Sequence, residues 1–287
     1  MSALRLWWMA ARPRPLPTGI APVLVGTALA ETFDVLRFVA ALVGAVFIQI
    51  GANLSNDYSD ARRGADTEDR LGPVRVTAGG LVPPRQVLIA TYVAFGVAVL
   101  AGAYLIAVAG VEILLVGVLS ILAGVLYTGG PRPYGYEGLG EVFVFLFFGV
   151  AAVAGSFFAQ TEKWTVEAFA VSVPVGLLAA AVLVVNNVRD MDTDRRAGKR
   201  TLAVKLGRDR TRALYAGMLA LAFVIAPVAT LEPLTLIVLV LVPLAVKLAR
   251  TVREHTDGPT LNKALGQTAL LQLAFCGLLA LSVAVTS

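Results

Sequence analysis

The stretch NNVRDMDTDRRAGKRTLAVKLG runs from Asn186 to Gly207 and directly follows the apolar run VPVGLLAAAVLVV. Asp190, Asp192 and Asp194 occupy alternating positions within it, and a series of Lys and Arg residues comes next. The apolar run belongs to a segment long enough to enter a bilayer as a helix. Concentrated negative charge at the end of such a helix is unfavourable by itself, so this stretch needs a positively charged partner.

The composition of the whole chain is that of an integral membrane protein. Of its 287 residues, 57% are hydrophobic and only 15% are charged, with a mean hydropathy of +0.78. The apolar residues fall into nine blocks of the length that spans a bilayer. We therefore expect an all-α bundle of nine transmembrane helices that forms a single domain over residues 1–287. The blocks lie at about residues 15–30, 36–55, 86–108, 111–128, 139–159, 167–188, 211–230, 233–252 and 263–285.

The distribution of positive charge predicts the orientation. Of the 24 Lys and Arg residues, 22 lie in the amino-terminal segment, in alternate connections, or near the ends of the blocks that border those connections; the other two are Arg37 and Lys163. Because cytoplasmic loops carry such an excess, we expect the amino terminus and the loops at 56–85, 129–138, 189–210 and 253–263 to be cytoplasmic. Ser287 would then lie outside the cell (inner) membrane. The net charge of +5 reflects this basic face, and no soluble basic domain is present to bind nucleic acid.

The longest polar connections predict where the chemistry takes place. They lie at 56–85 and 189–210, both on the expected cytoplasmic side, whereas the connections on the other side are short. Functional residues concentrate in long loops. The active site should therefore open on the cytoplasmic side.

The first of these loops begins with an acidic cluster. Asn53, Asp57 and Asp60 are spaced at i, i+4 and i+7, so we expect them on one helical face. Gly64 then allows the chain to turn, which brings the carboxylate of Asp66 back toward them. This spacing predicts a cluster of carboxylate and amide oxygens at the end of the second span.

The second loop begins with a similar cluster. Asn186, Asp190 and Asp194 are spaced at i, i+4 and i+8 and share one face, with Asn187 beside them, whereas Asp192 points elsewhere. The resemblance between NLSNDYSD and NNVRDMDTD suggests two similar half-sites that face one cavity.

A divalent cation fits these clusters. Carboxylate and amide oxygens without nearby His or Cys favour Mg²⁺, which takes one or two protein carboxylates and completes its shell with water and phosphate oxygens. Basic residues around the acids indicate a polyanionic ligand. They are Arg62, Arg63, Arg70, Arg75, Arg132, Lys199, Arg200 and Lys205.

At these residues the sequence resembles the UbiA superfamily of intramembrane prenyltransferases. NDYSD at 56–60 matches the first aspartate-rich motif of that family, and DMDTDRRAG at 190–198 resembles the second. Many members carry a third aspartate where this chain has Gly64, and here the acid is displaced to Asp66. That variant, with ARPRPLP at 11–17, GPVRVTAGGLV at 72–82 and YTGGPRPYGYEGLGE at 127–141, resembles the branch that prenylates 1,4-dihydroxy-2-naphthoate for menaquinone.

The resemblance implies a reaction and a set of site residues. A polyprenyl diphosphate would bind through Mg²⁺ between the clusters, ionise to an allylic cation, and be attacked by an aromatic acceptor that loses carbon dioxide. Membrane lipid would surround the bundle and its prenyl groove. The expected catalytic residues are Asp57, Asp60, Asp190, Asp194 and Tyr127. The expected metal ligands are Asp57, Asp60, Asp66, Asp190 and Asp194. The expected diphosphate contacts are Asn53, Asn56, Arg62, Arg75, Arg132, Asn186, Asn187, Lys199, Arg200 and Lys205.

Two other functions remain open at this point. A different acceptor, such as 4-hydroxybenzoate, would use the same diphosphate chemistry. A secondary transporter is the alternative from another class, but transporters place charged sites near the bilayer midplane, whereas the ionisable side chains here lie at the predicted span ends or in loops. The tyrosines of the loop, Tyr127, Tyr134 and Tyr136, either face the allylic cation or belong to an interfacial aromatic belt.

Overall fold

A computed structural model describes residues 2–65 and 71–286, and all of its regular structure is helical over these ranges. Each apolar block predicted from the sequence coincides with a helix or with two or three consecutive helical segments. The segments are α1 (Ala3–Ala11), α2 (Pro17–Ala28), α3 (Val35–Arg62), α4 (Pro84–Ala109), α5 (Glu112–Leu126), η1 (Tyr134–Glu137), α6 (Gly140–Val144), η2 (Phe145–Ala151), α7 (Ala152–Thr161), α8 (Val166–Arg196), α9 (Leu202–Leu206), α10 (Arg208–Thr230), η3 (Pro233–Leu241), α11 (Val242–Glu254) and α12 (Gly258–Thr286).

Seven helical stretches among the described residues are long and apolar enough to cross a membrane. Two of them are composite: α6, η2 and α7 form Gly140–Thr161, and η3 with α11 forms Pro233–Glu254. The remaining two predicted blocks correspond to the shorter apolar helices α2 and α5. The chain is thus a multi-pass membrane protein.

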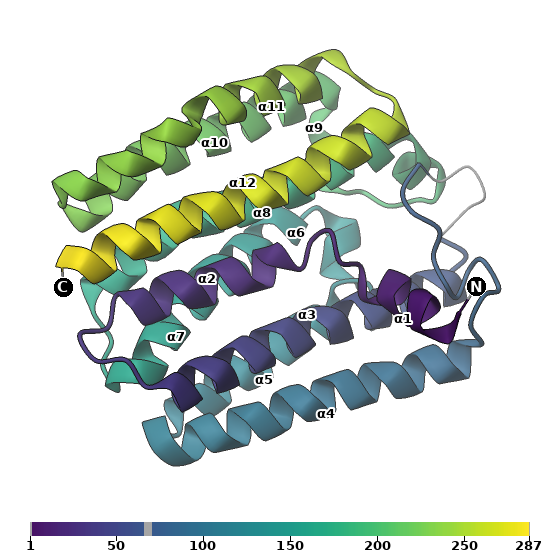
Figure 1. Cartoon of the computed structure of the whole chain (residues 1–287). Helices are drawn as coiled ribbons and strands as arrows, with labels where there is room; N and C mark the ends of the chain where they lie inside the picture. Colours follow the sequence, from purple (N-terminus) through teal and green to yellow (C-terminus); the bar gives the residue numbers. More distant parts are fainter. Residues whose placement is uncertain (1, 66–70, 287) are drawn as a thin grey trace.

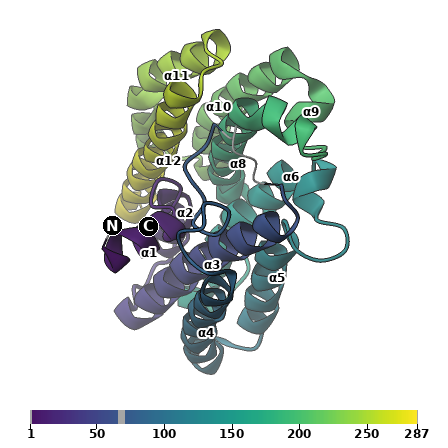
Figure 2. The ribbon, with the colours of Figure 1, turned by 90° about the vertical axis from the view of Figure 1, so that its right-hand side faces the viewer.

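The helices run side by side, so their connections gather at two opposite ends of the bundle (Figure 1). The amino terminus, α9 and the loops that follow α3 and α11 lie at one end, and the short connections lie with the carboxyl terminus at the other. Figure 2 faces the end with the long loops and shows α3, α4 and α5 on one side and α8, α10, α11 and α12 on the other. The two acidic clusters therefore lie at the same end.

The main apolar core joins α2 and α7 to α8, α10, α11 and α12. Within it η2 and α8 approach at backbone distance, since a Cβ atom built on Gly149 would lie 2.4 Å from the Cα of Gly176. η2 is a π-helical turn that includes Gly149, and such turns are frequent at functional sites. By contrast, α4 and α5 expose large apolar side chains such as Leu100 and Leu115, as expected for helices in contact with lipid.

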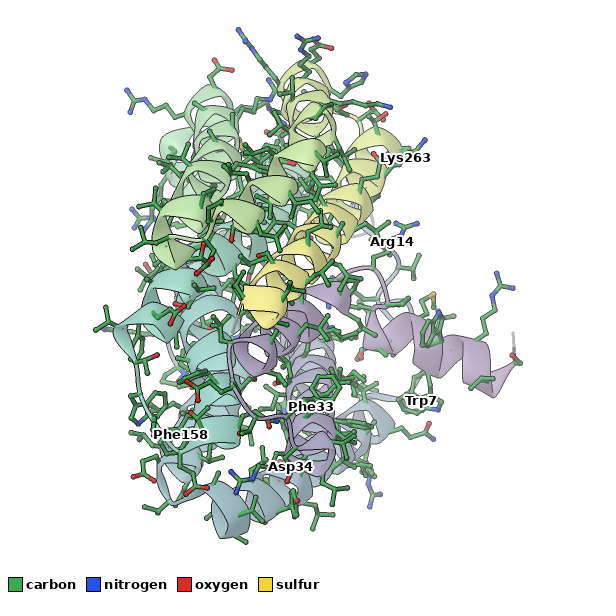
Figure 3. All side chains as sticks on the ribbon, turned by 60° about the vertical axis from the view of Figure 1, so that its left-hand side comes forward. Trp7, Arg14, Phe33, Asp34, Phe158 and Lys263 are labelled. Atoms are coloured by element: carbon green, nitrogen blue, oxygen red, sulfur yellow. The ribbon has the colours of Figure 1, made fainter. Side chains whose placement is uncertain are left out.

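A polar network closes the end of the bundle opposite the clusters. Arg37 donates from its guanidinium to the carbonyl of Val108 at 2.7 Å and to the carbonyl of Ala159 at 3.1 Å, and it pairs with Glu162 at 2.9 Å. Asp34, which caps the start of α3, lies at this end of the molecule in Figure 3. One side chain thereby ties together α3 and the carboxyl ends of α4 and α7.

Candidate active site

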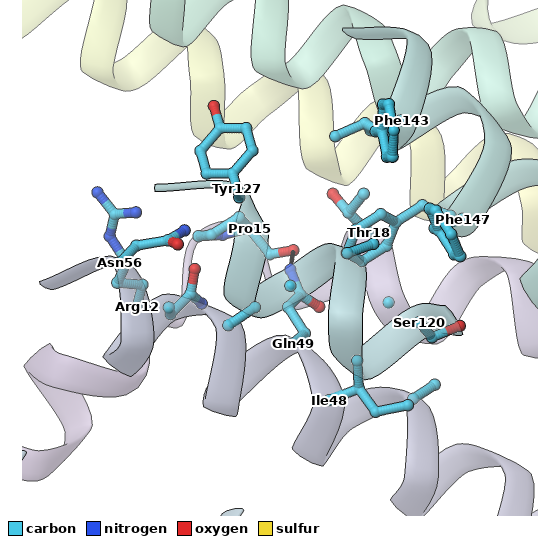
Figure 4. Close-up of a pocket in the computed structure, with 18 of the residues that line it drawn as sticks. Arg12, Pro15, Thr18, Ile48, Gln49, Asn56, Ser120, Tyr127, Phe143 and Phe147 are labelled. Atoms are coloured by element: carbon cyan, nitrogen blue, oxygen red, sulfur yellow. Dashed lines mark hydrogen bonds between the residues drawn. The ribbon is translucent and has the colours of Figure 1, made fainter. Parts of the chain in front are cut away.

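A cavity of about 1060 Å³ opens between the ends of α3 and α8 and continues between α3, α4, α5 and α7. Side chains from both acidic clusters line it, as do aromatic residues of the loop between α5 and α6. Figure 4 shows Asn56, Tyr127 and Phe143 around this space. The predicted half-sites therefore meet in one cavity.

The first cluster reaches the cavity through Asn53, Asn56 and Asp60. These positions follow one another by three and four residues on α3, so they share a helical face. Asp60 is only 2% exposed and accepts a hydrogen bond of 2.6 Å from the hydroxyl of Tyr136. Asn56 accepts a hydrogen bond of 3.0 Å from the hydroxyl of Thr128. Both side chains are thus held in place by the loop that follows α5.

Asp57 differs from the arrangement expected from its spacing. It does not line the cavity, and its carboxylate accepts hydrogen bonds from the backbone amides of Val76 at 3.0 Å and Thr77 at 2.9 Å. The reason is that the cavity face of α3 passes through Asn56 and Asp60, which places Asp57 about 100° to the side of Asn56. Asp57 therefore anchors the 71–83 loop, which the helical spacing did not reveal.

The second cluster lines the cavity with four residues of α8, namely Asn186, Asn187, Asp190 and Asp194. Asp192 points away and pairs with Arg208 at 2.7 Å, in agreement with the helical phase expected from the sequence.

Arg189 is a cavity residue that the sequence analysis did not single out. It is 3% exposed and donates to both carboxylate oxygens of Asp190, at 2.7 and 2.5 Å. It also donates to the side-chain carbonyls of Asn186 at 2.8 Å and Asn262 at 2.6 Å. The signal was present in the sequence, because Arg189 lies three residues after Asn186 on the same helix. Asp190 is thereby fixed, and α12 is joined to the site through Asn262.

Lys199 connects the two clusters across the cavity. Its ammonium nitrogen lies 3.2 Å from a carboxylate oxygen of Asp60 and 3.9 Å from one of Asp194, and 4.9 Å from the ring centre of Tyr136. Arg75 lies 3.5 Å from the same oxygen of Asp60. Carboxylates from α3 and α8 thus share one cation, Lys199, as expected for two half-sites of one site.

Among the described residues, the other predicted basic residues lie outside the cavity. Arg62 donates to the hydroxyl of Tyr58 at 3.0 Å on the exposed side of α3, and Arg132 is exposed in its loop. Arg200 contributes its backbone amide, which donates to the carbonyl of Tyr136 at 2.8 Å. The Lys205 ammonium donates to the carbonyl of Glu137 at 2.5 Å. Asp66 and Arg70 lie outside the described residues.

The aromatic residues form a continuous wall beside the acids. Tyr127, Tyr134 and Tyr136 all line the cavity, and the ring of Tyr134 stacks on Phe143 at 4.0 Å. The Tyr134 hydroxyl donates to the carbonyl of Ala123 at 2.7 Å, and burial raises its pKa above the usual value. Tyr134 therefore remains a neutral ring that presents its face rather than a charge.

The amino-terminal arm also lines the cavity, which the sequence analysis did not predict. The side-chain amide of Gln49 donates to the carbonyl of Pro15 at 2.6 Å, and that of Asn53 donates to the carbonyl of Ala11 at 3.1 Å. Arg12 has a left-handed backbone with φ of 58° and lies beside Asn56 in Figure 4. The available signal was the polar column that begins at Gln49 in an otherwise apolar helix. This column fastens the arm over the cavity.

A buried carboxylate, that of Glu141, forms a hydrogen bond with a residue of the second cluster. Glu141, at the start of α6, is 3% exposed, and its carboxylate accepts a hydrogen bond of 2.8 Å from the side-chain amide of Asn187. This contact fixes the side-chain amide of Asn187, which lines the cavity.

The donor set fits a hard divalent cation together with a phosphate. No group of three His, Cys, Asp or Glu side chains suited to a metal occurs within residues 2–65 and 71–286. Mg²⁺ does not need such a group, because one or two carboxylates with phosphate and water oxygens satisfy it. Asp60 and Asp194 already face one cation, the Lys199 ammonium, and Asn56 and Asn186, from the same two helices, also line the cavity.

Comparison with known proteins agrees with this geometry. The family model described as "UbiA prenyltransferase family" matches residues 19–284. The chain is 43% identical over 279 residues to the 1,4-dihydroxy-2-naphthoate octaprenyltransferase of Mycobacterium tuberculosis, covering 96% of this chain and 95% of that protein. It is 38% identical over 281 residues to the enzyme of the same name from Escherichia coli K12, covering 93% and 91%.

Solved structures share the fold at low sequence identity. A UbiA homologue from Archaeoglobus fulgidus bound to DMAPP and Mg²⁺ superposes with a TM-score of 0.69 at 15% identity, covering 98% of this chain and 99% of that one. An Aeropyrum pernix homologue without ligand gives 0.69 at 16% identity, covering 94% and 97%.

Proposed function

Because this chain belongs to the UbiA prenyltransferase family, we propose that it transfers a polyprenyl group from a polyprenyl diphosphate to 1,4-dihydroxy-2-naphthoate, with loss of carbon dioxide, to give demethylmenaquinone. The observation that carries this proposal is the meeting of two carboxylate and amide clusters through Lys199 at the mouth of a long apolar cavity. A polar end for diphosphate and an apolar extension for its tail match an amphiphilic donor. The curated relatives with this activity support the choice of acceptor.

The charged residues serve the departure of diphosphate. The allylic carbon–oxygen bond breaks with its electron pair going to the diphosphate, and negative charge grows on that leaving group. Lys199 and Arg75, both near Asp60, neutralise this charge, which lowers the barrier most effectively where water is excluded. Asp60, Asp190, Asp194, Asn56 and Asn186 would hold Mg²⁺, which supplies Lewis-acid stabilisation of the leaving group.

The aromatic wall and the cavity serve the cation and its capture. The ring faces of Tyr127, Tyr134 and Tyr136 stabilise positive charge, and the apolar lining excludes the water that would trap it. The ring carbon that bears the acceptor's carboxylate forms the new carbon–carbon bond. The carboxylate then leaves as carbon dioxide, and its electron pair restores the aromatic ring.

The proposal includes a position in the membrane. The site end, with the amino terminus and the long basic loops, faces the cytoplasm, and the carboxyl terminus lies outside. Support comes from the gathering of these loops at one end of the bundle (Figure 1) and from the excess of Lys and Arg in them. The whole chain would act as one catalytic domain, with the prenyl tail in contact with lipid.

The test is a competition between acceptors. Purified protein in lipid receives one polyprenyl diphosphate, Mg²⁺, and equal concentrations of 1,4-dihydroxy-2-naphthoate and 4-hydroxybenzoate, and the products are identified by mass. We expect the decarboxylated prenyl-naphthalenediol as the main product. Prenylated 4-hydroxybenzoate as the main product would refute the acceptor, and absence of any prenylated product would refute the reaction.

A further inference from the structure

The cavity is far deeper than a diphosphate requires. Along α3 its lining extends from Asp60 back to Ala41, a helical rise of about 28 Å. This distance is close to the ~30 Å thickness of a bilayer's apolar core. At the far end the lining reaches Ala159, whose carbonyl accepts from Arg37. The cavity is therefore a channel that begins at the acidic clusters and ends beneath the Arg37 network.

Three glycines line this channel and leave its interior free of side-chain atoms at their positions. Gly44 on α3, Gly102 on α4 and Gly117 on α5 all line it. A Cβ atom built on any of the three would meet no atom within 4 Å. Gly124 provides a contrast, because it also lines the channel but its Cβ would lie 3.0 Å from the side chain of Ala52. The first three glycines are therefore not explained by close helix packing.

We propose that Gly102 and Gly117 set the length of prenyl donor that this protein accepts, by leaving room for a long tail in the deep part of the channel. The inference rests on the proposed function and deepens it. A larger side chain at either position would project into the channel without disturbing its own helix contacts. A tail that ends before this level would not meet the new side chain, whereas a long tail would.

The positions along the helices support this discrimination. Gly117 lies ten residues before Tyr127 on the path of α5, a rise of about 15 Å from the aromatic wall. The diphosphate and the first isoprene units occupy the channel before that level. Substitution at Gly117 therefore acts on the distal tail and leaves the reacting carbon in place.

The test compares a short and a long donor in matched variants. Gly102→Leu and Gly117→Leu are assayed with geranyl diphosphate and octaprenyl diphosphate and a single acceptor. The control is Gly96→Leu, which lies on α4 like Gly102 and also has no atom within 4 Å of its Cβ, but is exposed and does not line the channel. Thermal stability is recorded for every variant.

We expect both channel variants to retain kcat/KM for geranyl diphosphate and to lose about tenfold or more for octaprenyl diphosphate, the scale of discrimination that apolar pockets give. Gly96→Leu should match the parent with both donors. Gly102→Ala and Gly117→Ala, which add one methyl group, should lower the ratio of kcat/KM for octaprenyl diphosphate to that for geranyl diphosphate by a smaller factor. These variants replace a Leu variant that does not fold.

Two results would overturn the inference. One is equal loss of both donors in a folded channel variant, and the other is an unchanged ratio of long to short donor in Leu and Ala variants alike. If the parent protein prenylates no acceptor with either donor, the proposed function itself fails. That outcome is seen before any variant is compared.

Discussion

Three residues of separation on α3 give Asp57 and Asp60 different partners. Asp60 faces Lys199 and Arg75 in the cavity, whereas Asp57 receives two backbone amides of the 71–83 loop. Both are almost fully buried, and both belong to the NDYSD motif at residues 56–60. The sequence motif alone therefore does not identify which of its two aspartates faces the cavity.

We predict that Asp60→Asn and Asp57→Asn fail in different ways. Asp60→Asn should lower kcat/KM by about a hundredfold or more, because it removes a carboxylate that would hold Mg²⁺ beside the departing diphosphate and that positions Lys199 and Arg75, with little change in melting temperature. Asp57→Asn should lower the free energy of unfolding by about 1–3 kcal/mol, because an amide replaces a charged acceptor of two hydrogen bonds. Activity and thermal unfolding are measured on both, and an identical melting temperature for the two would contradict the anchoring role.

We predict a similar contrast at the second cluster. Asp194→Asn should remove most activity, since Asp194 lines the cavity near Lys199. Asp192→Asn should be mild, because its ion pair with Arg208 lies at the surface, where such pairs contribute about 0–1 kcal/mol. The measurement is kcat/KM with one donor and acceptor, and equal losses would show that the cavity face of α8 is assigned wrongly.

The sequence predicted part of this site and missed part of it for identifiable reasons. Helical phase correctly separated Asp192 from Asp194, because α8 continues without interruption through both. It could not identify the contact of Asp57 with Val76 or the bridge from Lys199 to Asp60, because these partners come from loops that fold back over the helix ends. Positive charge near a membrane is common, so Lys199 could not be distinguished from Arg62, Arg132, Arg200 and Lys205 before their positions were known.

The length of the apolar blocks correctly predicted where helices occur, but it did not predict irregularities within a helix. Every predicted block coincides with helix, because the bilayer requires backbone hydrogen bonds to be satisfied within the segment. The π-helical turn η2 was not predicted, since its place follows from the close approach of Gly149 to Gly176. That contact depends on tertiary packing and has no local sequence period.

We predict that Arg37 stabilises the end of the bundle opposite the site. Arg37→Met should lower the free energy of unfolding by about 2–4 kcal/mol, because carbonyls on α4 and α7 lose a charged donor. The control is Lys163→Met, an exposed cation at the same end, which should change stability by less than about 0.5 kcal/mol. Thermal unfolding in detergent compares them, and equal stability of the two variants would contradict the role of the network.

For the whole molecule, we predict that the site end faces the cytoplasm. In a Cys276→Ala background, single cysteines at Ala65 and Arg195 should resist a membrane-impermeant thiol reagent in intact cells, and one at Lys163 should react. Arg195 is chosen in this loop because it is exposed. Gly198, three residues later, is unsuitable for substitution because its positive φ of 73° is one that other residues adopt poorly. Labelling of a cysteine at position 65 or 195 in intact cells would show that the site end faces away from the cytoplasm.

The shortness of α5 has a consequence for the surroundings of the protein. α5 has 15 residues, a rise of about 22 Å, which is less than the ~30 Å of apolar depth that a bilayer presents. We propose that the acyl chains of neighbouring lipids complete the wall of the cavity on the α5 side. Turnover should then vary with the thickness of the host bilayer, so that a change of lipid acts on this protein as a mutation would.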